Sequence, residues 1–157
     1  MSLRLLGLWI IVLLAGCITE KGASQFFGIK CDSAMKEACS QKVKSLLLDN
    51  SFYEVNGPNG VYQLNGVTYQ VFFRNRESAK SPCNPKSYNN CIVSAFRYDN
   101  TSSELVVMLR EVGEEDEPSN DAKKLFARLM DSTEAQFGHG SIRYLGNDFE
   151  FGVEASK

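Results

Sequence analysis

The pattern of apolar and polar positions along the chain predicts two amphipathic helices. Over residues 33–49, apolar residues recur at spacings of three and four, which is the period of a helix with one buried face. Residues 119–137 repeat this pattern, and Gly138 is placed to end the second helix. The apolar positions are Met35, Cys39, Val43, Leu46 and Leu47 in the first helix and Ala122, Leu125, Phe126, Leu129 and Thr133 in the second.

Segments of alternating polarity between and after these helices predict antiparallel strands. Asn65-Gly66 is the strongest hairpin signal in the chain, because both residues tolerate the positive φ of a tight two-residue turn. The sequence therefore predicts an α+β fold, in which two helices pack on one face of a meandering antiparallel sheet. The expected strands are residues 51–55, 61–64, 67–73, 91–98, 104–112, 141–145 and 149–153.

The first residues of the chain have the pattern of a secretory signal. Residues 5–15 are apolar or small, follow the single positive charge of Arg4, and are too few to span a bilayer. They end in Leu14-Ala15-Gly16-Cys17, and here the sequence resembles the bacterial lipoproteins, whose signal closes with this motif. The resemblance implies that residues 1–16 are removed and that Cys17 becomes an acylated first residue. Each buried acyl methylene adds about 0.8 kcal/mol, so several chains anchor a protein stably.

The residues after Cys17 bear on the location. In lipoproteins an aspartate at the next position favours the inner membrane, whereas this chain has Ile18 and Thr19. The resemblance therefore implies anchoring in the outer membrane, facing the periplasm. The alternative is an ordinary signal peptide followed by free secretion, in which case Asn100-Thr101-Ser102 becomes a glycosylation sequon.

Composition limits the remainder to one domain. Removing 16 of the 157 residues leaves 141, enough for a single core. The loss of Arg4 leaves 16 basic and 19 acidic residues, a net charge near −3, which argues against nucleic acid as a partner. We expect residues 17–30 to form the lipidated N-terminus and a polar tether, with Phe26 and Phe27 as a first packed contact, and residues 31–157 to form the domain.

Four cysteines remain after Cys17, namely Cys31, Cys39, Cys83 and Cys91. An even number in an oxidising compartment predicts two disulfides, and a spacing of eight differs from that of zinc sites. Three pairings are possible. If Cys31 and Cys39 belonged to one helix, they would be separated by about 12 Å, beyond disulfide reach. This favours cross-links from the first helix to the 83–91 region, unless the helix begins later.

No catalytic constellation stands out in the sequence. His139, the only histidine, lies between two glycines that suit a loop after a helix. The acidic stretch lacks the spacing of a calcium loop and is expected to be a solvated segment ahead of the second helix. We therefore expect no enzyme activity and no cofactor beyond the lipid on Cys17. The acidic residues are Glu111, Glu114, Glu115, Asp116, Glu117 and Asp121.

The long connection over residues 74–90 is the main candidate for binding a partner, because loops of this length are often functional. We expect a protein-binding or assembly factor of the cell envelope. The alternatives are an inhibitor or immunity protein acting on a secreted enzyme, and a carrier whose uncovered sheet face binds an apolar ligand. The loop candidates are Arg74, Arg76, Lys80, Lys86 and Tyr88. The pocket candidates, most of which we expect to be core residues, are Phe72, Phe96, Tyr98, Tyr144, Phe149 and Phe151.

Overall fold

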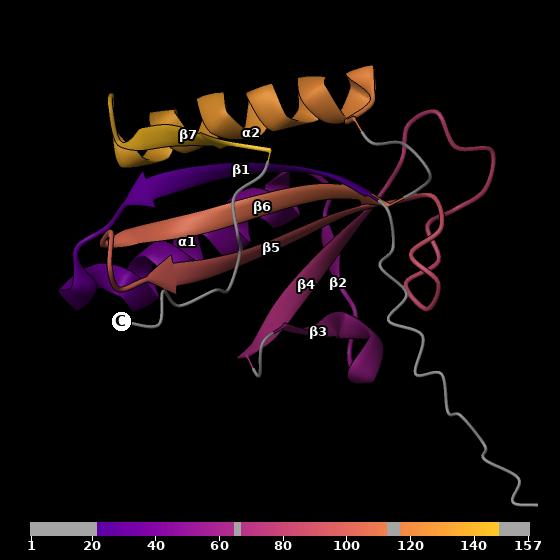
Figure 1. The fold of residues 1–157 in the computed structure, drawn as a ribbon, viewed down its shortest axis with the longest axis horizontal. Helices are drawn as coiled ribbons and strands as arrows, with labels where there is room; N and C mark the ends of the chain where they lie inside the picture. The colour runs from indigo at the N-terminus through magenta and orange to yellow at the C-terminus, as the bar shows by residue number, and fades with distance from the viewer. Residues whose placement is uncertain (1–21, 65–66, 113–116, 148–157) are drawn as a thin grey trace, which may run out of the picture.

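The computed structural model describes residues 22–64, 67–112 and 117–147, which form one sheet and two helices (Figure 1). The helices are α1 (Lys36–Asp49), preceded by the 3-10 turn η1 (Ser33–Met35), and α2 (Asn120–Phe137); a second 3-10 turn is η2 (Pro58–Gly60). The strands are β1 (Gly22–Lys30), β2 (Tyr53–Glu54), β3 (Val61–Leu64), β4 (Val67–Asn75), β5 (Cys91–Asp99), β6 (Glu104–Val112) and β7 (Ile142–Gly146).

All pairings in the sheet are antiparallel, in the order β2-β4-β5-β6-β1-β7, with β3 paired to β4 beside β2. The predicted meander is confirmed in β4, β5 and β6. Leu64 pairs with Val67, the register that a two-residue turn at Asn65-Gly66 requires, although those two residues lie outside the described part. The predicted last strand, residues 149–153, also lies outside it.

The predicted tether is wrong from residue 22 onward. Residues 22–30 form β1, which lies between β6 and β7 and pairs with both. Phe27 and Ile29 are fully buried on one face of this strand, and Phe26 is buried on the other. The sequence pattern does not indicate this strand, because Ser24, Gln25 and Gly28 interrupt the apolar run expected of a strand that is buried on both faces.

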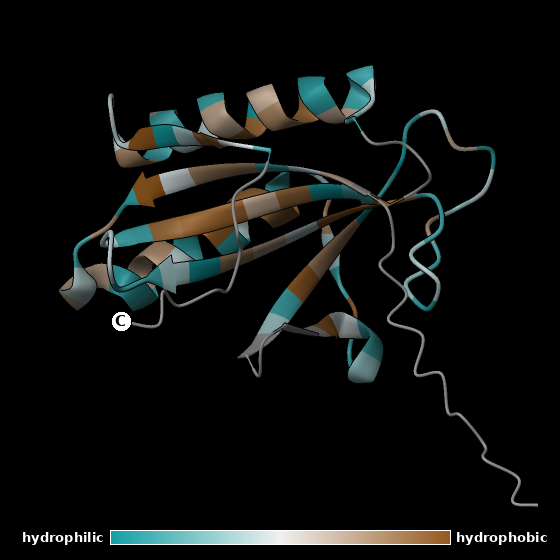
Figure 2. Cartoon of the chain, in the orientation of Figure 1, coloured by the Kyte–Doolittle hydropathy of each residue, from teal (hydrophilic) through white to brown (hydrophobic). Residues whose placement is uncertain are grey.

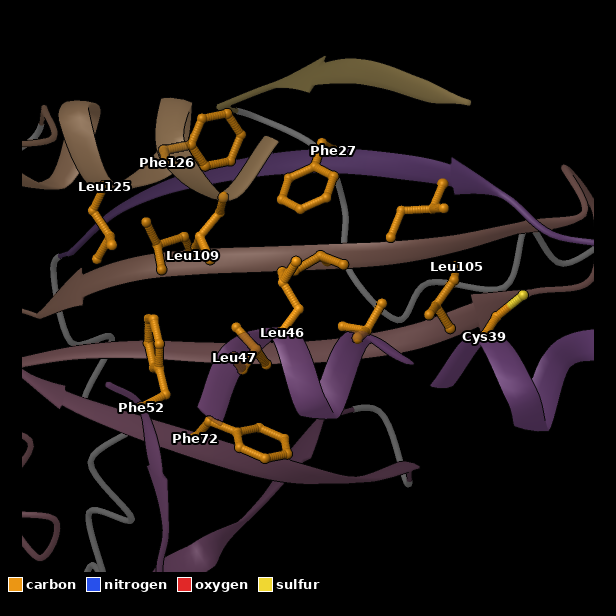
Figure 3. Close-up of a cluster of buried hydrophobic side chains, with 14 of the residues drawn as sticks. Phe27, Cys39, Leu46, Leu47, Phe52, Phe72, Leu105, Leu109, Leu125 and Phe126 are labelled. Carbon is orange, nitrogen blue, oxygen red and sulfur yellow. The ribbon is translucent and has the colours of Figure 1, made fainter. Parts of the chain in front are cut away.

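Both helices pack on the same face of the sheet, as predicted (Figure 3). Leu46 and Leu47 of α1 point toward β4, β5 and β6, while Phe126 of α2 meets Phe27 of β1 edge to face at 5.5 Å between ring centroids. Edge-to-face contacts of this kind add to the stability gained from burying the two rings. The shared core also contains Leu125 and Leu129 of α2 and Leu105, Val107 and Leu109 of β6.

Two disulfides are present, but the preferred pairing was wrong. Cys31 bonds to Cys39 and Cys83 bonds to Cys91. The α-helix begins only at Lys36, and Cys31 lies ahead of η1, so eight helical residues never separate the first pair. Their Cα atoms are 6.5 Å apart, within the range of a disulfide. The helix therefore starts late enough for Cys31 to reach Cys39, the one case in which the sequence analysis allowed this local pairing.

Candidate functional site

The long connection predicted over residues 74–90 is shorter at its start, because β4 extends through Asn75 and includes Arg74. Hydrogen bonds within the β4–β5 loop, residues 76–90, define its path. The amide of Cys83 donates to the side-chain oxygen of Asn75 at 2.9 Å, and the amide of Asn84 donates to the carbonyl of Asn89 at 3.0 Å. The amide of Arg76 donates to the carbonyl of Asn90, which closes the base of the loop. Figure 2 shows that the loop is largely hydrophilic, in contrast to the strands that it joins.

The Cys83–Cys91 disulfide joins the middle of this loop to the first residue of β5. Both cysteines are buried and pack with Phe73 and Val93 on the sheet face opposite the helices. Tyr88 lies over Phe73, with 5.7 Å between ring centroids. The loop is therefore attached to the sheet by a covalent bond and by an aromatic contact, so little conformational entropy remains to be lost when it binds a partner.

Three of the five predicted loop candidates serve the fold. Tyr88 packs on the sheet, and the Arg74 guanidinium binds Glu77 at 2.7 Å and the carbonyl oxygen of Asn50. Arg76 lies 2.8 Å from the carboxylate of Glu111. These side chains hold the ends of the loop against the strands and α1.

Glu111 is a residue whose importance the sequence analysis missed. It was expected in a solvated acidic stretch, but it is only 6% exposed and lies on the helix face of β6. Its two carboxylate oxygens accept hydrogen bonds from the Ser119 amide at 2.8 Å and the Ser119 hydroxyl at 2.9 Å. Ser119 is the N-cap of α2, so one carboxylate joins the β4–β5 loop, through Arg76, to the start of α2.

A signal for Glu111 was present in the sequence. Residues 105, 107 and 109 are apolar and share a face, and position 111 continues their alternation toward the helices. The other members of the acidic stretch differ from it. Glu117 is 85% exposed, while Glu114, Glu115 and Asp116 lie outside the described residues.

Lys80 and Lys86 are the loop candidates that remain available for a partner. Both side chains are exposed, and neither has an ion-pair partner among residues 22–64, 67–112 and 117–147. The amide of Lys86 is held by the side chain of Asn84 at 3.0 Å, so this lysine projects from a defined backbone position. The loop thus presents two ammonium groups on a rigid support.

His139 lies in the loop after α2 and is fully exposed. Its Nδ1 is 2.9 Å from Glu134, and the two residues line a shallow surface depression together with Asp131. The amide of Gly140 also donates to Glu134, so this carboxylate orders the turn out of the helix. This arrangement is that of a helix-ending loop, as predicted.

The four described residues among the pocket candidates lie on the helix face of the sheet and not on the opposite face. Phe72 stacks on Phe96 with 5.7 Å between ring centroids, and the Tyr98 hydroxyl donates to the carbonyl of Cys31 at 3.0 Å. Tyr144 meets Phe126 of α2 edge to face. The expectation that most of these rings belong to the core is confirmed for Phe72, Phe96 and Tyr98. None of the four described residues lines the uncovered face, as the carrier alternative would require; Phe149 and Phe151 lie outside the described part.

Comparisons with known proteins leave the site to be judged on its own geometry. Neither a protein-family model nor a curated protein matches this chain. Within the described part, no group of three His, Cys, Asp or Glu residues is arranged to hold a metal ion. No helix among the described residues is long and apolar enough to cross a membrane; residues 1–17, which carry the lipoprotein motif, lie outside them.

Proposed function

We propose that this protein is a lipid-anchored, non-enzymatic component of the bacterial envelope that binds another protein through the β4–β5 loop. The observation that carries the proposal is the rigid presentation of Lys80 and Lys86 on a loop closed by a disulfide. Binding by a loop already in its bound conformation avoids the cost of ordering it. The lipoprotein motif ending at Cys17 supports the anchor, and the resemblance implies the periplasmic face of the outer membrane.

A second candidate is an inhibitor or immunity protein that neutralises a secreted lytic enzyme or toxin. The same feature favours it, because an exposed loop fixed by a disulfide can be inserted into an active-site cleft with little reorganisation. The two candidates differ in the partner: an envelope component in one case, and a secreted hydrolase or toxin in the other.

Crosslinking in intact envelopes, followed by affinity purification, tests the proposal. The double variant Lys80→Ala, Lys86→Ala should lose most of the crosslinked partner. Lys30→Ala, Lys36→Ala is the matched control, since it removes two exposed lysines from the other end of the sheet. Equal recovery of the partner with both variants would contradict a role for the loop.

The anchor is tested separately with Cys17→Ala. This variant should no longer be labelled by a fatty-acid probe and should be recovered in the soluble fraction. Continued labelling would mean that the lipoprotein interpretation is wrong, whatever the loop binds.

A further inference from the structure

The start of β1 and the β4–β5 loop lie at the same end of the sheet (Figure 1). Gly22 pairs with Val112 at the end of β6, and Asn75 pairs with Cys91 at the start of β5. Ile92 and Glu111, which are the neighbours of Cys91 and Val112 in the chain, pair with each other between β5 and β6. Both pairs therefore lie at the same end of the sheet. Neighbouring strands are about 4.8 Å apart, so the first residue of β1 and the last residue of β4 are separated laterally by about 15 Å.

The opposite end of the sheet is formed by other loops. There Glu104 pairs with both Lys30 and Asp99, which places the β5–β6 turn and the exit from β1 together. The turn from α2 into β7 is at this end as well (Figure 1). Because β1 has nine residues, the two ends are about 30 Å apart.

The start of β1 at Gly22 limits how far the domain can move from its anchor. A tether of residues 18–30 would have let the domain move freely, whereas β1 already begins at Gly22. Five residue steps separate Cys17 from Gly22, and they span at most about 18 Å. An acylated Cys17 therefore keeps the Gly22 end of the sheet close to the lipid headgroups.

We propose that the β4–β5 loop faces the bilayer and that the protein it binds is an integral membrane protein with acidic residues near the membrane surface. This inference rests on the proposed lipid anchor and on binding through the loop. A globular protein of 100 residues has a radius of gyration of about 13 Å. If the strands stand perpendicular to the membrane, the gap between the loop and the headgroups is no wider than the reach of about 18 Å from Cys17 to Gly22. A soluble partner of that size is wider than this gap, whereas a membrane protein presents its surface at the level of the headgroups.

Charge at this end of the domain favours a protein over the lipid itself. Lys80 and Lys86 are accompanied there by Glu117, Asp121, Lys123 and Lys124 at the start of α2, which the bond between Ser119 and Glu111 holds beside the loop. Lys123 pairs with Glu117 at 3.7 Å, so the surface alternates basic and acidic groups and is not the purely basic cluster typical of binding to anionic lipid. A mixed surface instead matches a partner with its own pattern of charges.

The orientation can be tested with the full-length acylated protein in vesicles of phosphatidylethanolamine and phosphatidylglycerol. A fluorescent amino acid is placed at Ser87 in the β4–β5 loop or, as the matched control, at Asn100 in the β5–β6 turn; both positions are exposed. Lipids that carry a quencher on the headgroup should reduce the fluorescence several-fold more at position 87 than at position 100. In Cys17→Ala, neither position should be quenched.

Equal or stronger quenching at position 100, or no quenching at either position of a vesicle-bound protein, would overturn the orientation while leaving the anchor intact. Failure of the acylated protein to bind vesicles would instead contradict the proposed anchor. A photo-crosslinking amino acid at position 87, used in intact envelopes, then identifies the partner. A crosslinked protein without a membrane-spanning segment would overturn the second part of the inference.

Discussion

Glu104 and Arg143 form a bidentate ion pair across β1, the strand that lies between theirs. Glu104 is on β6 and Arg143 on β7, and the carboxylate accepts hydrogen bonds from Nε at 3.1 Å and from Nη2 at 2.6 Å. The carboxylate lies directly over Gly28 of β1, where a Cβ atom would be 2.7 Å from Oε2. The hydrogen bond and the charge of Glu104 raise the pKa of Arg143 above its ordinary value.

We expect Gly28→Ala to displace this carboxylate and to cost about 1–2 kcal/mol of the free energy of unfolding. The cost should vanish in a Glu104→Ala background, because the new methyl group then meets no carboxylate. Urea denaturation of the two single variants and the double variant gives the coupling free energy directly. The same cost in both backgrounds would show that Gly28 is required for another reason.

Loss of the Glu111 carboxylate should be more damaging. Glu111→Ala leaves Arg76 without its partner and removes two hydrogen bonds from Ser119, so we expect a loss of about 3 kcal/mol. Ser119→Ala removes the cap and one hydrogen bond to Glu111 but leaves the ion pair with Arg76, and it should cost about 1 kcal/mol. Thermal denaturation measures both, and Glu117→Ala, which alters an exposed carboxylate nearby, should leave the Tm unchanged. A Glu111→Ala variant as stable as the wild type would contradict the role assigned to this residue.

The N-terminal boundary of the domain gives a direct test of β1. A chain that starts at residue 22 should fold, whereas one that starts at residue 31 should not, because it lacks the strand between β6 and β7. Its loss exposes two sheet edges and uncovers the core beneath Phe27 and Ile29. Circular dichroism and gel filtration distinguish a folded monomer from an aggregate. Cooperative unfolding of the shorter chain would contradict the position of β1.

The two disulfides allow a matched comparison, because both bridge cysteines that are eight residues apart. The entropy of loop closure predicts about 2–3 kcal/mol for each. Replacing either pair by serine should therefore lower the free energy of unfolding by a similar amount. Partner binding should fall only for Cys83→Ser, Cys91→Ser, whose bridge holds the β4–β5 loop. Equal binding of the partner by the two double variants would show that binding does not depend on the rigidity of the loop.

Asp99 makes the stability of the β5–β6 turn depend on pH. Partial burial alone would raise the pKa of this carboxyl, but hydrogen bonds from Ser102 and Thr101 outweigh it and hold the pKa below its ordinary value. A depressed pKa contributes stability above the unfolded value, near 3.9, and this contribution is lost as the pH falls through the folded value. The Tm difference between wild type and Asp99→Ala should therefore be largest above about pH 5 and should shrink as the pH falls below the unfolded value and through the lower folded one. For Asn100→Ala, a neighbour that does not titrate, the difference should not vary with pH; the same flat profile for Asp99→Ala would contradict the assignment.

Local patterns in the sequence were sufficient for most of the fold. Both helices, the 61–64/67–73 hairpin and the β5–β6 pair were predicted, since each depends on periodicity and turn residues within a short segment. The errors arose where long-range pairing decides the structure. Ser24, Gln25 and Gly28 form a strand because β6 and β7 supply hydrogen bonds on both sides, and a short segment gives no sign of them.

The candidate site was predicted in part, for the same reason. The position of the β4–β5 loop and the exposure of Lys80 and Lys86 could be expected from length and composition. The structural use of Arg76 could not, because its partner Glu111 lies on a strand that meets the loop only after the sheet has formed. The disulfide pairing depended on the few residues by which the helix starts after Cys31.

Each disulfide closes a short segment, and this has a consequence for how the chain finds its topology. Neither bridge joins strands that are distant in the sequence, whereas β1 must find β6 and β7 across most of the chain. The bridges therefore carry no information about strand order, and that order is selected by packing and hydrogen bonding alone. We therefore expect the reduced chain, wherever it is still stable enough to fold, to have the same strand order as the oxidised one.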